Sequence, residues 1–185
     1  MEGRTSNPGD GRPLPIEVDR MPQIPGFRVP EEFYIVLESP GRLAGTVRPS
    51  ERTPWDRLAR ERFEYVVCLT DDEPSYDPSP IEILHSVDLE DLYGGLSPTD
   101  PTREAERIVE AVDRVAVALR SGHGVVVHCA GGTGRTGTVI GGVLRRFGHS
   151  ASGVRGYLDR INRCRGIGWP ESFWAGSLLD RIDPS

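Results

Sequence analysis

The residues of this chain best suited to covalent chemistry are a cysteine and an arginine joined by a short run of small residues. Cys129 and Arg135 enclose Ala130, Gly131, Gly132, Thr133 and Gly134. Small residues allow the backbone to curl tightly, so that successive N–H groups point toward a common centre. The segment therefore predicts a cradle for phosphate, sulfate or a similar oxyanion.

The flanking elements strengthen this prediction. Residues 124–128 predict a buried strand, and the apolar segment 136–147 predicts a helix that begins just after the cradle. A helix N-terminus adds free N–H groups and the positive end of its dipole, and this field favours the thiolate form of a cysteine. Arg135 would present a planar fork to two oxygens of the bound anion and stabilise charge on them in the transition state. Cys129 is thus the predicted nucleophile.

The wider segment, His128-Cys129-x-x-Gly132-x-x-Arg135-Thr136-Gly137, resembles the signature H-C-x-x-G-x-x-R-[ST]-G of protein-tyrosine and dual-specificity phosphatases. The resemblance extends over about 33–182, and the compact length is similar to the dual-specificity branch. It implies hydrolysis of phosphate monoesters through a phosphocysteine intermediate, without metal or cofactor. The implied substrate is a phosphorylated protein or peptide, at phosphotyrosine or at phosphoserine and phosphothreonine as well.

The resemblance also implies roles for single residues. Cys129 would attack phosphorus while the amides of 130–135 hold the phosphate. The hydroxyl of Thr136 would hydrogen-bond the cysteine sulfur and help it leave. His128 would order the loop without transferring protons itself.

In this family an aspartate protonates the leaving group, from a loop between the strand and the helix that precede the signature. We predict Asp91 for this role, with Asp88 as the alternative and Asp100 as a helix cap. The loop is longer than usual in the family. A glutamine that positions water in many members is absent from residues 169–174, so hydrolysis of the intermediate could be organised differently.

Other interpretations remain open at this point. The glycines after Cys129 resemble the turn of a dinucleotide-binding domain, but they lie too far along the chain for a complete one. A domain that binds phosphorylated partners without turnover is a second alternative. Phosphoinositides are disfavoured because the loop interior has no basic residue. A protective disulfide between Cys68 and Cys129 is a further hypothesis.

The elements that must position these residues alternate between strands and helices. Strands are predicted at 33–37, 42–47, 65–69, 81–87 and 124–128, and helices at 54–62, 101–120, 136–147, 154–161 and 173–182. The predicted fold is a single α/β domain with a central mixed, mainly parallel sheet flanked by helices. Residues 1–30, rich in Pro and Gly, are predicted to be a flexible segment or one that drapes over the catalytic domain at 31–185.

Charge and cysteine content exclude several classes of protein. A net charge of -6 makes nucleic acid or an anionic membrane an unexpected partner. Three cysteines provide no disulfide framework, which favours a reducing, cytoplasmic setting. No apolar run reaches the roughly 20 residues that span a membrane. The oligomeric state is left open.

Overall fold

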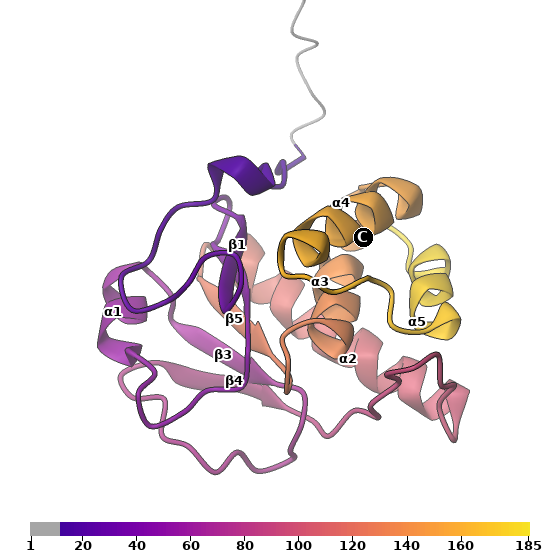
Figure 1. The fold of residues 1–185 in the computed structure, drawn as a ribbon, viewed down its shortest axis with the longest axis horizontal. Helices are drawn as coiled ribbons and strands as arrows, with labels where there is room; N and C mark the ends of the chain where they lie inside the picture. The colour runs from indigo at the N-terminus through magenta and orange to yellow at the C-terminus, as the bar shows by residue number, and fades with distance from the viewer. Residues whose placement is uncertain (1–11) are drawn as a thin grey trace, which may run out of the picture.

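The computed structural model describes residues 12–185, so the first eleven residues of the predicted flexible segment lie outside it. The strands are β1 (Phe33–Leu37), β2 (Leu43–Thr46), β3 (Tyr65–Cys68), β4 (Glu82–Ser86) and β5 (Val125–His128). They form one sheet in the order β1-β2-β5-β3-β4 (Figure 1). Within the described residues β1 alone pairs antiparallel. The prediction of a mixed, mainly parallel sheet is confirmed.

The helices follow the predicted order. They are α1 (Trp55–Arg60), α2 (Pro101–Arg120), α3 (Gly134–Arg146), α4 (Ala151–Cys164) and α5 (Phe173–Leu178), with 3-10 turns η1 (Val18–Arg20) and η2 (Leu179–Arg181). α2 has the predicted bounds, and each of the other four differs from the prediction at one end or both. Apolar spacing predicts the middle of a helix, whereas capping side chains decide its start. Ser150, for example, accepts a hydrogen bond from the Gly153 N–H and starts α4 earlier than predicted. No helix in residues 12–185 is long and apolar enough to cross a membrane.

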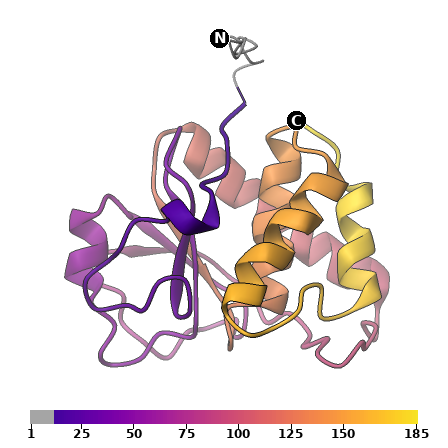
Figure 2. The ribbon, with the colours of Figure 1, turned by 45° about the horizontal axis from the view of Figure 1, so that its top comes forward.

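The sheet is buried on both faces by two separate cores. On one face, Trp55 and Leu58 of α1 pack in a core that includes Val126 of β5. On the other face, helices α2 to α5 cover Val125 and Val127. Because side chains alternate along a strand, a strand such as β5, with three consecutive valines and all four residues buried, is expected where both faces are covered. Figures 1 and 2 show α1 on one side and the other helices gathered on the opposite side.

The long helix α2 begins where the sequence predicts. The side chain of Asp100 accepts hydrogen bonds from the N–H groups of Thr102 and Arg103, and Pro101 occupies the first helical position. Such a cap contributes about 1 kcal/mol. Asp100 is therefore a helix cap, and the aspartates of the preceding loop are left as candidates for the proton donor.

Residues 12–30 lie against the domain. The Ile16 N–H donates to the Val36 carbonyl at 2.8 Å, and the Tyr157 hydroxyl donates to the Ile16 carbonyl at 2.8 Å. Met21 and Ile24 are buried. This part of the N-terminal segment thus contacts both the first strand and α4.

Candidate active site

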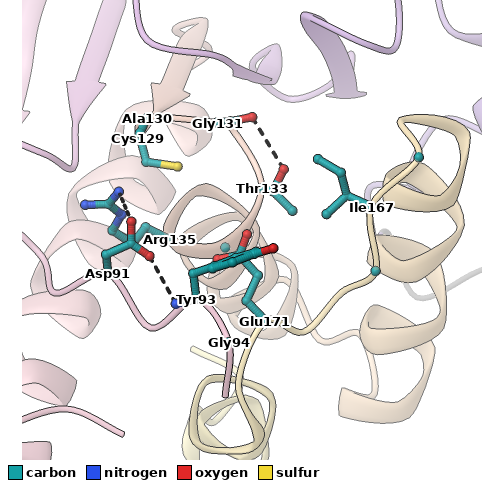
Figure 3. A pocket seen from close by; sticks show the side chains of 13 residues that line it. Asp91, Tyr93, Gly94, Cys129, Ala130, Gly131, Thr133, Arg135, Ile167 and Glu171 are labelled. Carbon is teal, nitrogen blue, oxygen red and sulfur yellow. Dashed lines mark hydrogen bonds and ion pairs between the residues drawn. The ribbon is translucent and has the colours of Figure 1, made fainter. Parts of the chain in front are cut away.

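The predicted cradle lies at the carboxyl end of β5, the central strand, where open α/β sheets bind their ligands. Cys129 follows β5 directly and lines a cavity of about 690 Å³. Figure 3 shows its sulfur pointing into this space. The cradle residues that line the cavity are Ala130, Gly131, Thr133, Gly134 and Arg135. The strand, loop and helix therefore form the anion site that the motif predicts.

Gly132 does not line the cavity but turns the loop behind it. Its φ of +68° lies in the left-handed region, which a side chain rarely adopts. A Cβ at this position would also lie 2.5 Å from the carbonyl oxygen of Thr46 on β2. Glycine is required here for both reasons, which accounts for its place in the motif.

Two residues distant in sequence hold the carbonyl groups of the loop from behind. Arg165 donates to the carbonyls of Gly131 at 2.6 Å and Gly132 at 2.9 Å. The Tyr34 hydroxyl donates to the Gly132 carbonyl at 2.8 Å, and the Arg165 guanidinium lies over the Tyr34 ring at 5.1 Å. Because C=O and N–H point in opposite directions in a trans peptide, these contacts turn the N–H groups of Gly132 and Thr133 away from Arg165 and toward the cavity side. The sequence analysis missed both residues, since neither belongs to a local motif.

The hydroxyl of Thr136 does not make the predicted bond to the Cys129 sulfur. Thr136 is fully buried, and its Oγ1 has no hydrogen-bond partner among residues 12–185. A helical threonine often bonds the carbonyl four residues earlier. Here that carbonyl, of Gly132, already accepts from Tyr34 and Arg165, which occupy both of its lone pairs. The hydroxyl is therefore a free donor in the first turn of α3.

His128 is buried behind the loop with both ring nitrogens in contact with polar atoms. Its Nδ1 lies 3.3 Å from the Cys129 carbonyl oxygen, and its Nε2 contacts the Tyr76 hydroxyl. Burial lowers the pKa of His128 to about 4. The imidazole is thus neutral at pH 7, donating from Nδ1 to the Cys129 carbonyl and accepting at Nε2 from Tyr76.

The structure brings Asp91 to the same cavity as Cys129 and Arg135. The Asp91 carboxylate lies 3.2 Å from an Arg135 guanidinium nitrogen and accepts the Tyr93 N–H at 3.0 Å. Asp88, the alternative acid, is not among the cavity residues. Of the two aspartates, Asp91 alone reaches the reacting centre in the described residues.

A second carboxylate, that of Glu171, was not predicted from the sequence. Glu171 lines the cavity, accepts a hydrogen bond from the Gly134 N–H, and lies where a Cβ on Gly134 would be. Burial, followed by the nearby charge of Asp91, raises the pKa of Glu171. The Gly95 N–H donates to the Glu171 carbonyl at 3.0 Å, which joins the two loops that carry the carboxylates. The site therefore contains two carboxyl groups, those of Asp91 and Glu171, in different environments.

The geometry disfavours a disulfide between Cys68 and Cys129. Cys68 pairs in register with His128, and its sulfur lies 3.6 Å from the Thr70 hydroxyl. Because side chains alternate along the sheet, the residue after His128 faces the other way. The two sulfurs are therefore directed to opposite faces, which a bridge does not allow without backbone movement.

Three comparisons with solved structures place this fold among phosphatases. Tk-PTP, in its active form, is 27% identical over 77% of this chain and 92% of its own, with a TM-score of 0.55. TpbA of P. aeruginosa is 16% identical over 85% and 94% of the two chains, with a TM-score of 0.56. Human DUSP28 is 18% identical over 76% and 87%, with a TM-score of 0.54.

A family model also matches most of the chain. Residues 33–164 match the model described as PTP-SAK, the Swiss Army Knife protein, DSP-PTPase phosphatase domain. The matched range runs from β1 to the end of α4 and contains the cysteine, the arginine and Asp91. This chain therefore belongs to the PTP-SAK family and is a cysteine phosphatase of the DSP type.

Proposed function

We propose that this protein hydrolyses phosphate monoesters on proteins or peptides, at phosphotyrosine above all, through a phosphocysteine intermediate and without a metal ion. The observation that carries the proposal is the convergence of Cys129, Arg135 and Asp91 on one cavity at the N-terminus of α3. This reaction needs a thiol as nucleophile, a cation that can bind two phosphate oxygens, and a carboxyl group as proton donor.

In the first step, the Cys129 thiolate attacks phosphorus in line with the ester oxygen. The S–P bond forms as the P–O bond breaks, and the leaving oxygen takes a proton from Asp91. Arg135 and the loop N–H groups stabilise the negative charge on the three remaining oxygens. The products are the free alcohol or phenol and phosphocysteine.

In the second step, water attacks phosphorus and the S–P bond breaks. The bonding pair returns to sulfur, and the free Thr136 hydroxyl is the donor that stabilises the departing thiolate. The proton of the water goes to a carboxylate. We assign this role to Glu171, which lines the cavity beside the cradle at Gly134 and whose pKa is raised by burial. Glu171 then releases this proton to solvent, and Asp91 regains from solvent the proton that it gave up in the first step.

The cavity walls favour an aryl phosphate over a shorter alkyl one. Tyr93 and Ile167 line the cavity and reach its mouth, where both are exposed. A phenyl ring that carries the phosphate to Cys129 would contact these side chains, whereas serine and threonine have no ring to fill the space. Phosphotyrosine is the proposed substrate residue for this reason.

Hydrolysis of para-nitrophenyl phosphate, with EDTA and a thiol reductant present, tests the proposal. We expect activity in the wild type and in Cys164→Ser, which removes an exposed cysteine, but none in Cys129→Ser. Chemical trapping should detect phosphocysteine in the wild type. An inactive wild type that still binds a phosphotyrosine peptide would instead support a binding domain without turnover.

A further inference from the structure

Exposed apolar side chains gather beside the cavity. In residues 12–185 the large exposed apolar residues are Leu14, Ile83, Tyr93, Leu96, Val117, Ile167 and Phe173. Four of them belong to two short segments that border the cavity. We call this group the apolar rim, which comprises Tyr93, Leu96, Ile167 and Phe173. Contiguous exposed apolar groups of this kind mark binding surfaces, whereas scattered ones need no explanation.

The two segments of the apolar rim are held next to each other. The Gly95 N–H donates to the carbonyl of Glu171, which links the loop that carries Tyr93 and Leu96 to the start of α5. Figure 3 shows Tyr93 and Ile167 on different sides of the space into which the Cys129 sulfur points. Phe173, the first residue of α5, is 89% exposed. Tyr93 and Ile167 thus line the reaction cavity, and Leu96 and Phe173 each follow a lining residue, Gly94 or Glu171, by two positions in the chain.

The charges at the cavity limit what can lie on this surface. The charged residues that line it are Arg135, Asp91 and Glu171, so two carboxylates stand against one guanidinium. Arg165 does not line the cavity, and its guanidinium donates to the loop carbonyls. One phosphate can be held in the cradle, but a second phosphate or an acidic side chain at the mouth would be repelled.

We propose that the apolar rim binds the residues that flank phosphotyrosine, and that the preferred substrate is a protein segment with apolar neighbours and no acidic ones. This inference rests on the proposed function and adds the sequence context of the substrate. Apolar contact with Phe173 and Leu96 supplies the attraction, and the two carboxylates exclude acidic sequences and polyphosphorylated compounds.

Two phosphotyrosine peptides test the inference. They have equal length and differ only in the residues next to phosphotyrosine, which are Leu and Val in one and Glu in the other. We expect the wild type to show a kcat/KM roughly tenfold higher for the apolar peptide. In Phe173→Ser and in Leu96→Ser, the ratio of kcat/KM for the apolar peptide to that for para-nitrophenyl phosphate should fall roughly fivefold. Val117→Ser removes an exposed apolar residue of α2 and should keep the wild-type ratio.

The possible outcomes separate this inference from the proposed function. A wild type without activity on para-nitrophenyl phosphate would overturn both. A wild type that is active but uses the two peptides equally, or prefers the acidic one, would overturn the inference alone. The same holds if Val117→Ser lowers the ratio as much as Phe173→Ser does. A higher kcat/KM for vesicles that contain a phosphoinositide would replace the peptide with a lipid substrate.

Discussion

The carboxylate of Asp91 lies 3.2 Å from the guanidinium of Arg135, which is the group proposed to bind the substrate phosphate. The phosphate and Asp91 therefore compete for one cation. A phosphate that takes both guanidinium nitrogens would release the Asp91 carboxyl at the mouth of the cavity, where the ester oxygen leaves. In the proposed mechanism, this contact would couple substrate binding to proton donation.

Replacing Asp91 by Asn should lower kcat by roughly 10²–10⁴-fold, because an amide cannot protonate the leaving oxygen. The loss should be largest for phenyl phosphate and smallest for dinitrophenyl phosphate, whose leaving group needs no proton. Asp88→Asn is the matched control and should remain near wild type. A larger loss in Asp88→Asn than in Asp91→Asn would mean that Asp88 is the acid.

Replacing Arg135 by Lys should lower kcat/KM by at least roughly a hundredfold, because a point charge cannot reproduce the two parallel hydrogen bonds of the guanidinium. Inhibition by vanadate, which occupies the phosphate site, should weaken in parallel. Arg163→Lys, at an exposed ion pair on α4, is the control. Near-normal kcat/KM in the Arg135 variant would contradict the role given to this residue.

Replacing Glu171 by Gln should slow hydrolysis of the intermediate more than its formation, since the amide cannot accept a proton from water. Rapid mixing with para-nitrophenyl phosphate should then show a burst of nitrophenolate close to the enzyme concentration, followed by slow turnover. The steady rate should not depend on the leaving group. Loss of activity without a burst would place Glu171 in the first step. Glu110→Gln, on the surface of α2, should behave as the wild type does.

Replacing Arg165 by Ala should weaken inhibition by tungstate roughly tenfold or more, because charge-assisted bonds to the loop carbonyls are lost. The free energy of unfolding in urea is measured separately, because replacing any residue that stabilises the fold would lower it. Arg163→Ala, an exposed residue in the last turn of α4, two positions before Arg165, is the control. If tungstate binds the Arg165 variant with unchanged affinity, the loop does not depend on this contact.

The stability of the protein should fall below pH 6.5 because of His128. Its folded-state pKa of about 4 is lower than the ordinary value, so the unfolded chain binds a proton that the folded chain does not. This contribution is complete above the unfolded pKa and is lost as pH falls toward 4. Urea unfolding should show a loss from this residue of about 2 kcal/mol between pH 7 and pH 5.

The variant His128→Gln isolates this effect. It should flatten the dependence of unfolding free energy on pH over this range, whatever its stability at pH 7. His123→Gln, which replaces a half-buried histidine beside Tyr65, should keep the wild-type slope. An unchanged slope in His128→Gln would mean that the histidine is not held neutral.

The fold and the cradle could be predicted because their signals are local. Cys129, the glycines and Arg135 lie within one strand, loop and helix, and each conformation depends on neighbours in sequence. The apolar run of β5 and the cap at Asp100 are local in the same sense. Helix ends were predicted less well, since capping bonds and not apolar spacing decide them.

The amino-acid sequence by itself determined the α/β fold, the position of the cradle, and the cysteine and arginine that line the cavity with it. Only the tertiary structure showed that Asp91 lines the cavity and Asp88 does not, brought Glu171 to the cavity, and set Arg165 and Tyr34 behind the loop. Tyr34 lies 98 residues from the carbonyl to which it donates, a contact that no pattern of neighbouring residues encodes. Such contacts arise when separate elements pack on the same sheet, because packing depends on the shape of the whole core.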